Sequence, residues 1–222
     1  MAVALLLLTL NEIEGVKEIL PKINKELFSE IVVVDGGSTD GTIEEAQKMG
    51  FKVIQQTLRG HGGAIISGVN ATTANNILIF GPDGNHDPET IPDLIKKLEE
   101  GYDQVINSRF GKTSINDDAG TIDAFGNKMF SFLASKLFGG NLTDTLNEYR
   151  IITRKAFNEL NFDALYTDST FQMSIKGMKK KQKMFEIIGN EGARIGGTRK
   201  MHPFPTGCRL CKRLLIELVK DN

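Results

Sequence analysis

The chain alternates between two patterns of apolar residues. Short runs that are apolar at almost every position indicate strands buried on both faces, and apolar residues three and four positions apart indicate helices packed against them. The predicted strands are 2–10, 31–35, 51–55, 77–80, 103–107, 146–153 and 183–188. The predicted helices are 13–27, 43–49, 62–72, 88–100, 125–138, 169–178 and 208–219. This order predicts an α/β fold with a Rossmann-like, mostly parallel sheet and helices on both faces.

The segment from Ile31 to Thr42, IVVVDGGSTDGT, is the most informative part of this pattern. Asp35 ends a buried strand, at the edge where open α/β sheets bind their ligands. Two glycines then allow a tight turn, and a helix begins just beyond the serine and threonines. A carboxylate and hydroxyl groups beside a helix N-terminus suit a nucleotide. We therefore predict that Asp35 and Ser38 bind a nucleotide.

Polar residues also follow the first and third strands. Thr9, Asn11 and Glu12 are predicted to line the same crevice, although Asn11 is equally well explained as a helix N-cap. After the third strand, RGHGGA combines an arginine with small residues at the start of a helix. Backbone N–H groups there can approach an anion, so we predict that Arg59 contacts a diphosphate.

The fourth strand ends in GPDGNHDPE, residues 81–89. Oxygen ligands grouped at a strand end suit Mg²⁺ or Mn²⁺, which prefer carboxylates and substrate phosphates. We predict that Asp83 and Asn85 bind such an ion, whereas Asp87 is better explained as a helix cap. The sequence leaves the role of His86 open.

Arginines mark the second half of the chain. Arg109 ends a strand, DTLNEYR spans residues 144–150, and RIGGTRK spans residues 194–200. Arginines at strand ends in a cleft are candidate phosphate contacts, although each one alone is better explained as a surface charge.

The chain resembles the family 2 glycosyltransferases of GT-A fold in a series of ordered motifs: LTLNE, VVVDGGSTDGT, RGHGGA, PDGNHDPE, NSRF, GNKMF and TDTLNEYR. Within that family it is similar to the dolichol-phosphate mannose synthase group, and the resemblance spans roughly residues 3–200. The resemblance implies transfer of a hexose from a nucleoside diphosphate donor, with inversion at the anomeric carbon.

On the donor side, the resemblance implies that Arg59 lies near the diphosphate. It makes Asp83 the second acid of the family's DxD metal motif, and Asn85 a polar metal ligand two residues later. Gly36 and Gly81 stand where the family usually has further acids, and the loss at Gly81 should weaken a divalent site. Metal binding could then rest on Asp83 and Asn85 alone, or cations such as Arg59 could replace the metal. The nucleoside would be held by Thr9, Asn11, Glu12 and Asp35.

On the acceptor side, Arg109 matches an arginine that meets the acceptor's phosphate, and Asp144 and Arg150 match an element near the acceptor. Glu148 and Tyr149 replace the GF of the usual SGFR. Acids stand before GNKMF, where lipid-phosphate synthases have a serine and an arginine; these are Asp117, Asp118 and Asp123. They would repel a phosphate and favour a hydroxyl acceptor with a carboxylate as general base. The candidate bases are Asp144, Glu148 and Asp118.

Three functions remain as expectations. The first is hexose transfer in cell-envelope or surface polysaccharide synthesis, with Asp83, Asp144 and Glu148 as catalytic residues. The second is synthesis of a polyprenyl- or dolichyl-phosphate sugar at a membrane surface. The third is a nucleotide-sugar-binding protein with weakened catalysis, suggested by Gly36 and Gly81. The expected partners are a nucleoside diphosphate sugar and a glycan or lipid-phosphate acceptor.

Length and charge set the remaining expectations. At 222 residues the chain fits a single domain, with 1–110 as the nucleotide-binding half and 111–222 as the acceptor half. A net charge of −1 gives no footprint for nucleic acid. The apolar start is too short to span a bilayer, so we expect a cytoplasmic protein, peripheral at the inner membrane face at most. The sequence leaves a homodimer open, and Cys208 and Cys211 are expected to be reduced packing residues.

Overall fold

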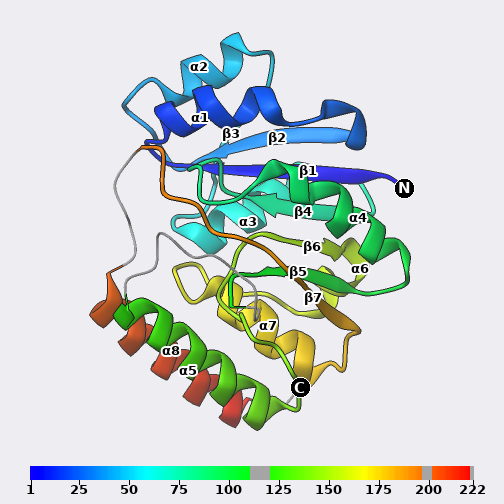
Figure 1. Cartoon of the computed structure of the whole chain (residues 1–222), viewed down its shortest axis with the longest axis vertical. Helices are drawn as coiled ribbons and strands as arrows, with labels where there is room; N and C mark the ends of the chain where they lie inside the picture. Colours follow the sequence, from blue (N-terminus) through cyan, green and yellow to red (C-terminus); the bar gives the residue numbers. More distant parts are fainter. Residues whose placement is uncertain (111–120, 197–201, 221–222) are drawn as a thin grey trace.

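A seven-stranded sheet forms the centre of the computed structural model, which describes residues 1–110, 121–196 and 202–220 (Figure 1). The strands are β1 (Val3–Thr9), β2 (Glu30–Asp35), β3 (Lys52–Gln55), β4 (Asn76–Phe80), β5 (Gln104–Ser108), β6 (Arg150–Thr153) and β7 (Met184–Ile188). Their order is β3-β2-β1-β4-β6-β5-β7. Of these strands, β6 runs antiparallel to both of its neighbours, and every other pair is parallel. The predicted mostly parallel α/β sheet is confirmed.

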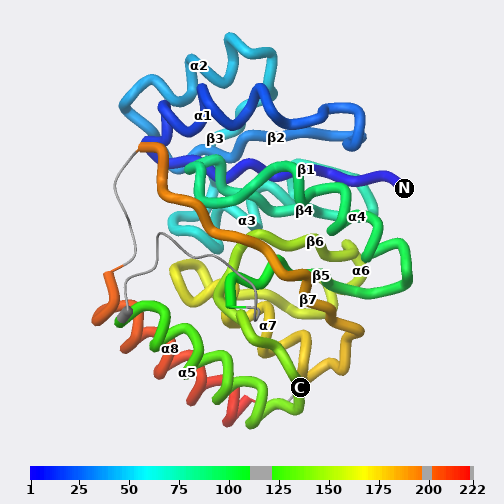
Figure 2. Tube along the Cα trace, in the orientation of Figure 1, coloured from blue at the N-terminus to red at the C-terminus, as the bar shows by residue number. Residues whose placement is uncertain are grey.

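Helices cover both faces of the sheet, as predicted (Figure 2). One face carries α1 (Ile13–Ile19), α2 (Thr42–Lys48) and α4 (Ile91–Glu99). The other face carries α3 (His61–Asn70), α6 (Arg154–Glu159) and α7 (Ser169–Lys179). Helices α5 (Thr121–Phe138) and α8 (Pro203–Val219) pack against α7 and against each other at one end of the molecule.

The central strand β1 explains why the apolar runs are continuous. Its side chains alternate between the two faces, so that Leu5 and Leu7 join one core cluster while Leu6 and Leu8 join the other. Both clusters are covered by helices, and every residue of β1 is buried. A strand sandwiched in this way has no solvent face on which a polar residue would be favoured.

Several predicted elements differ in extent from those observed, and the helices predicted over 125–138 and 208–219 begin earlier, at Thr121 and Pro203. The helix predicted over 13–27 ends at Ile19 and continues as the 3₁₀ helices η1 (Leu20–Lys22) and η2 (Lys25–Leu27). Pro21 accounts for this break, because it lacks the N–H that the next helical turn requires. A third 3₁₀ helix, η3 (Pro88–Thr90), precedes α4.

The strand predicted over 146–153 starts only at Arg150. The residues before it form a loop whose backbone N–H groups bond to side chains, including Leu146 to Asp144 and Tyr149 to Asn147. The six-residue helix α6 was not predicted, because it is too short to display a helical repeat of apolar residues.

The expectation of packing cysteines is wrong. Cys208 and Cys211 are free thiols, but both are exposed on α8. The buried side of that helix is formed instead by Thr206, Leu210 and Glu217.

The direction of β6 decides which loops meet at the functional edge. The carboxyl ends of β1, β2, β4 and β5 lie at one edge of the sheet, where parallel strands end together. Because β6 runs the other way, its amino end lies at that same edge. Residues 144–149 are thereby brought beside the loops that follow β4 and β5.

The close packing of α3 against the loop before α7 gives a first prediction. A Cβ on Gly62 would overlap the carbonyl oxygen of Ala164 and lie 2.9 Å from Cβ of Ser169. We expect Gly62→Ala to lower the free energy of unfolding by about 1–3 kcal/mol, because backbone must move. Gly126→Ala on α5 is the control, since its Cβ would meet nothing within 4 Å. Urea unfolding of both variants is the measurement; equal stability would contradict the packing described.

Candidate functional site

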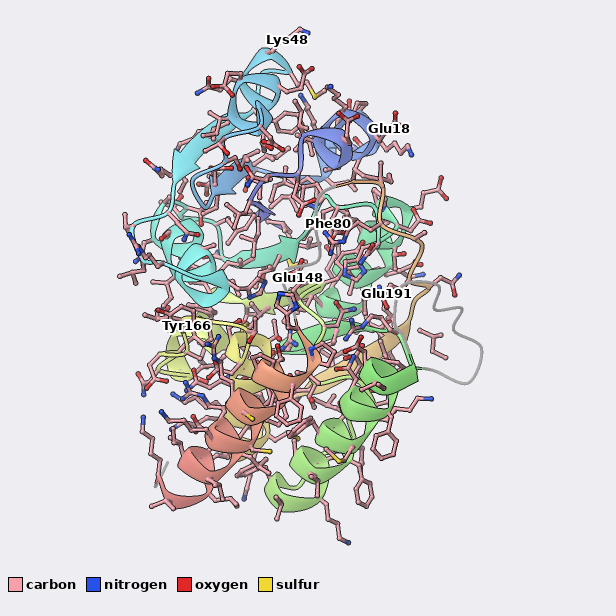
Figure 3. All side chains as sticks on the ribbon, turned by 90° about the vertical axis from the view of Figure 1, so that its left-hand side faces the viewer. Glu18, Lys48, Phe80, Glu148, Tyr166 and Glu191 are labelled. Atoms are coloured by element: carbon pink, nitrogen blue, oxygen red, sulfur yellow. The ribbon has the colours of Figure 1, made fainter. Side chains whose placement is uncertain are left out.

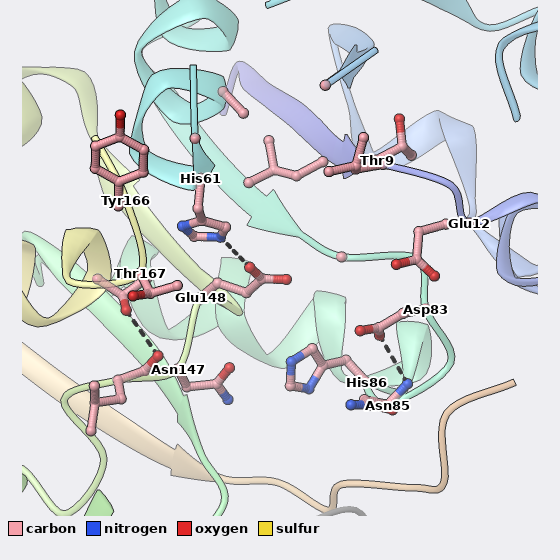
Figure 4. Close-up of a pocket in the computed structure, with 18 of the residues that line it drawn as sticks. Thr9, Glu12, His61, Asp83, Asn85, His86, Asn147, Glu148, Tyr166 and Thr167 are labelled. Carbon is pink, nitrogen blue, oxygen red and sulfur yellow. Dashed lines mark hydrogen bonds and ion pairs between the residues drawn. The ribbon is translucent and has the colours of Figure 1, made fainter. Parts of the chain in front are cut away.

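A cleft of about 740 Å³ opens at this edge of the sheet. Figure 3 looks onto the edge, with Glu148 and Glu191 in the central part of the molecule. In Figure 4 the carboxylates of Glu12, Asp83 and Glu148 point toward the open centre of the cleft. The predicted site residues that line it are Thr9, Glu12, Arg59, Asp83, Asn85, Arg109 and Glu148. The structure therefore brings together residues from both halves of the chain.

Asp35 lies behind the cleft wall rather than among its lining residues. Its Oδ1 accepts the N–H groups of Gly37 and Ser38 at 2.8 and 2.7 Å. Its Oδ2 accepts the hydroxyls of Ser38 and Thr9 at 2.5 and 2.8 Å. These four hydrogen bonds occupy the acceptor sites of the Asp35 carboxylate. Asp35 thus fixes the turn after β2, and its direct contact with a nucleoside stays a prediction.

Asn11 and Ser38 join the loops that follow β1 and β2. The N–H of Asn11 donates to Ser38 Oγ at 2.8 Å, and Asn11 Oδ1 accepts the N–H of Thr39 at 2.8 Å. Glu12, not Asn11, occupies the N-cap position of α1, so the helix-cap explanation of Asn11 is wrong. Neither Asn11 nor Ser38 lines the cleft, and their nucleotide contacts stay predictions.

The turn after β4 presents Asp83 to the cleft. Oδ1 of Asp83 accepts the N–H of Asn85 at 3.1 Å, and Oδ2 pairs with Arg194 at 2.9 Å. Arg194 also donates to Glu12 at 3.3 Å. The next residue, Ile195, is also bonded to this turn, because its N–H donates to the carbonyl oxygen of Asp83. The predicted cap at Asp87 is confirmed, since its side chain accepts the N–H of Glu89.

Glu148 is paired with His61, the first residue of α3. Oε2 of Glu148 contacts Nε2 of the imidazole, and Nδ1 of His61 bonds to Ser169 Oγ at 2.7 Å. Burial raises the pKa of Glu148, but the charge and hydrogen bond of His61, with smaller effects of His86 and Arg194, outweigh it and lower the pKa to about 2. A carboxylate with so low a pKa is a weak general base at neutral pH. The base role predicted for Glu148 is therefore not supported.

Asp144 forms an ion pair with Arg109. The guanidinium donates to both carboxylate oxygens, Nε to Oδ2 at 2.7 Å and NH2 to Oδ1 at 3.0 Å, and it also reaches Glu191 at 3.2 Å. Asp144 is fully buried and does not line the cleft. Burial raises its pKa, yet the charge and hydrogen bonds of Arg109 outweigh this and lower it. Asp144 is thus misplaced for the catalytic role predicted, and it positions Arg109 instead. The third candidate base, Asp118, lies outside the described residues.

Arg150 does not meet the cleft either. It is fully buried, and its guanidinium donates to the carbonyl of Asn147 at 2.6 and 3.1 Å and to Ser174 at 3.2 Å. Burial lowers its pKa to about 10, so it stays charged at neutral pH. The acceptor contact predicted for Arg150 is wrong, because its buried guanidinium is hydrogen-bonded to the loop before β6.

His86 is a buried residue of the cleft floor. Its ring lies 5.2 Å from that of Tyr149 and 6.4 Å from that of Phe80. Burial lowers its pKa, which favours the neutral imidazole. Its Nδ1 has no hydrogen-bond partner among the described residues.

The donor set fits a divalent cation that arrives with a nucleotide. Asp83 and Asn85 supply a carboxylate and an amide oxygen from one turn that lines the cleft. Within the described ranges, no three His, Cys, Asp or Glu side chains are grouped to hold a metal by themselves. Mg²⁺ commonly binds through one or two carboxylates plus substrate phosphates, so such a group is not required.

The lining residues that were not assigned a role from the sequence include His61, Glu191 and Arg209. His61 stood within a quoted motif, but its ion pair with Glu148 joins positions far apart in the chain. Arg209 lies on α8, over the ring of Tyr166 at 4.7 Å. Nothing in the local sequence of an amphipathic helix marks that arginine as part of a site.

The sequence matches the family described as Glycosyl transferase family 2 over residues 5–161, and the chain belongs to that family. It is 30% identical over 184 residues to glycosyltransferase AglJ of Haloferax volcanii, covering 80% of this chain and 60% of that protein. It is 29% identical over 219 residues to a dolichyl-phosphate hexose transferase of the same organism, covering 96% and 92%. The chain therefore spans less than two thirds of the first relative and most of the second.

The fold is similar to that of glucosyl-3-phosphoglycerate synthase from Mycobacterium tuberculosis, solved in complex with Mn²⁺, UDP and phosphoglyceric acid. The TM-score is 0.80 at 18% identity, and the match covers 100% of this chain and 80% of that chain. This likeness confirms the predicted GT-A fold. Within the described residues, no helix is both long and apolar enough to cross a membrane.

The corrected role of Asp144 can be tested by stability. Asp144→Asn removes the partner of a buried cation, so we expect a loss of about 3–5 kcal/mol in the free energy of unfolding. Because the folded-state pKa of Asp144 is lowered, its contribution is present above the unfolded value of about 3.9 and fades as pH falls further. The difference in free energy of unfolding between the parent protein and Asp144→Asn should therefore be smaller at acid pH.

Denaturant unfolding at neutral and acid pH is the measurement, with Asp93→Asn on the exposed side of α4 as the control. A variant of Asp144 that is fully stable but inactive would restore the general-base hypothesis.

Proposed function

We propose that this chain transfers a hexose from a nucleoside diphosphate to the phosphate group of a polyprenyl- or dolichyl-type lipid at a membrane surface. The single observation that carries the choice of acceptor is the pairing of Glu148 and Asp144, the two predicted bases that the structure describes. Glu148 is ion-paired with a pKa of about 2, and Asp144 is buried against Arg109. A hydroxyl acceptor needs a base to take its proton, whereas an ionised phosphate does not.

The donor would lie across the ends of β1, β2 and β4. Thr9, Leu10 and Gly36 line that end of the cleft and leave room for a nucleoside. Arg59 lies two residues before α3, exposed and without an ion pair in the described part of the chain, so it can meet the diphosphate. Mg²⁺ or Mn²⁺ held by Asp83 and Asn85 would neutralise the leaving diphosphate.

The acceptor would enter from the other end of the cleft. Asp123 and Asn127 of α5 and Arg209 of α8 line that end, so a cation lies there together with the acid that was expected to repel a phosphate. Arg109 lies between the two ends, oriented by Asp144 and Glu191, and can contact the attacking phosphate through a fixed guanidinium. The phosphate oxygen would then displace the diphosphate in one step, from the opposite side of the sugar.

Helices α5 and α8 also carry an apolar surface toward solvent. On α5, Ile122, Phe125 and Phe132 are 73%, 70% and 67% exposed. On α8, the exposed apolar residues include Phe204, Leu215 and Val219. A helix with such a face can lie in the interface of a bilayer. This supports a lipid surface as the partner of the α5–α8 pair and brings the acceptor's headgroup to the adjacent end of the cleft.

Turnover tests the reaction. We expect hexose transfer from a UDP- or GDP-hexose to polyprenyl phosphate, with a product that extracts into organic solvent. Asp83→Asn should lower the rate by about 10²–10³-fold, the cost of removing one charge that stabilises the leaving group. Asp87→Asn, in the same turn but outside the cleft, keeps its helix cap and should be nearly unchanged.

Transfer to soluble glycan hydroxyls alone would favour polysaccharide synthesis instead. Nucleotide binding without turnover by folded protein, with any donor, would favour the binding-protein alternative.

Vesicle binding tests the membrane surface. Full burial of a Phe side chain is worth about 1.5–3 kcal/mol, so Phe125→Ser with Phe132→Ser should weaken binding to phosphatidylglycerol-containing vesicles by more than about tenfold. Ile188→Ser, which removes an exposed apolar residue from β7, is the matched control. Flotation of the three proteins with vesicles gives the comparison. Equal flotation of the double variant and the parent protein would show that the α5–α8 face is not the contact.

A further inference from the structure

Gly81 and Glu148 lie just beyond the paired ends of the antiparallel strands β4 and β6. The register of β4 and β6 pairs Ile79 with Arg150, and two further steps place Gly81 opposite Glu148. The pair between them stays in contact, since the rings of Phe80 and Tyr149 lie 5.0 Å apart. Side chains directly opposite in an antiparallel pair share one face. A side chain at either position would therefore enter the same space.

Glu148 fills that space. A Cβ on Gly81 would overlap Oε1 of Glu148 and lie 3.4 Å from its Cδ, and no other described residue beyond the chain neighbours comes within 4 Å. The φ angle of Gly81 is not positive, so the backbone itself does not require glycine here. Within the described residues, only the carboxyl group of Glu148 lies where a side chain at position 81 would begin.

The orientation of Glu148 leaves one oxygen for a ligand. Oε2 is held by His61, which is itself held by Ser169 at 2.7 Å. No hydrogen bond within the described residues involves Oε1, the oxygen that lies over Gly81. Ligating carboxylates are commonly fixed by such a second hydrogen-bonded partner. Glu148 and Asp83 both line the cleft and point toward its centre (Figure 4).

We propose that Glu148 supplies, from the β6 side, the carboxylate that the β4 side lacks at Gly81, so that Glu148 and Asp83 together hold the divalent cation of the donor complex. This inference rests on the proposed function. It accounts for two departures from the family motifs at once, because the acid at position 148 occupies the space that an acid at position 81 would fill.

Binding of Mn²⁺ tests the proposal independently of turnover. Electron paramagnetic resonance titration with Mn²⁺ in the presence of UDP or GDP gives the dissociation constant. Loss of a residue that only orients a ligand costs about 10–100-fold in metal affinity, so loss of a direct ligand in Glu148→Gln should cost at least about tenfold. Glu14→Gln, an exposed acid on α1 outside the cleft, is the control and should bind Mn²⁺ like the parent protein.

Exchange of the two residues gives the sharpest comparison. Glu148→Gly should weaken Mn²⁺ binding as Glu148→Gln does. Gly81→Asp alone places two carboxyl groups in one space and should lower thermal stability. Together, Gly81→Asp and Glu148→Gly return a single carboxylate to that space, and we expect most of the Mn²⁺ affinity to return.

Two results would overturn the proposal. Unchanged Mn²⁺ affinity in Glu148→Gln would remove Glu148 from the site. A folded double variant that binds no better than Glu148→Gly would show that the two positions are not equivalent. Asp83→Asn separates this from the proposed function: if it loses Mn²⁺ while Glu148→Gln does not, only the role of Glu148 fails. If neither loses Mn²⁺, metal use at this turn fails as well.

Discussion

The reversed direction of β6 is the constraint on which the site depends. A parallel strand in that place would send residues 144–149 to the opposite edge of the sheet. Because β6 is antiparallel to β4 and β5, its preceding loop meets the loops that follow them. Asp144 can then orient Arg109, and Glu148 can reach His61 and the turn of Asp83. The loop before β6 is thus one of the segments of the second half of the chain that line the cleft.

Many charged side chains of the cleft are paired with a side chain of opposite charge. Arg109 lies between Asp144 and Glu191, Arg194 lies between Glu12 and Asp83, and His61 holds Glu148. Charges buried in this way are costly unless each has a partner with good geometry, and loss of one partner leaves the other uncompensated. The network therefore places most acids of the cleft in supporting roles. Exposed cations such as Arg59 remain for the phosphates of the substrates.

Local patterns were sufficient to predict the seven strands, the helices other than α6 and the polar turns that end β1, β2 and β4. They were sufficient because those strands are specified by continuous apolar runs, and the turns after β2 and β4 by their glycines. The roles of Asp144, Glu148 and Arg150 could not be read in the same way. Each depends on a partner distant in the chain, so the sequence shows a charged residue but not whether it faces the cleft or a buried counter-charge.

The central claim is that side chains from the ends of β1, β4 and β5, with the loop before β6, grip an activated sugar in one cleft. The most direct measurement is a crystal structure with a nucleoside diphosphate and Mn²⁺. The account predicts the diphosphate between Arg59 and the turn of Asp83, with the nucleoside beside Thr9 and Gly36. A nucleotide bound elsewhere on the protein, with this cleft empty, would contradict it.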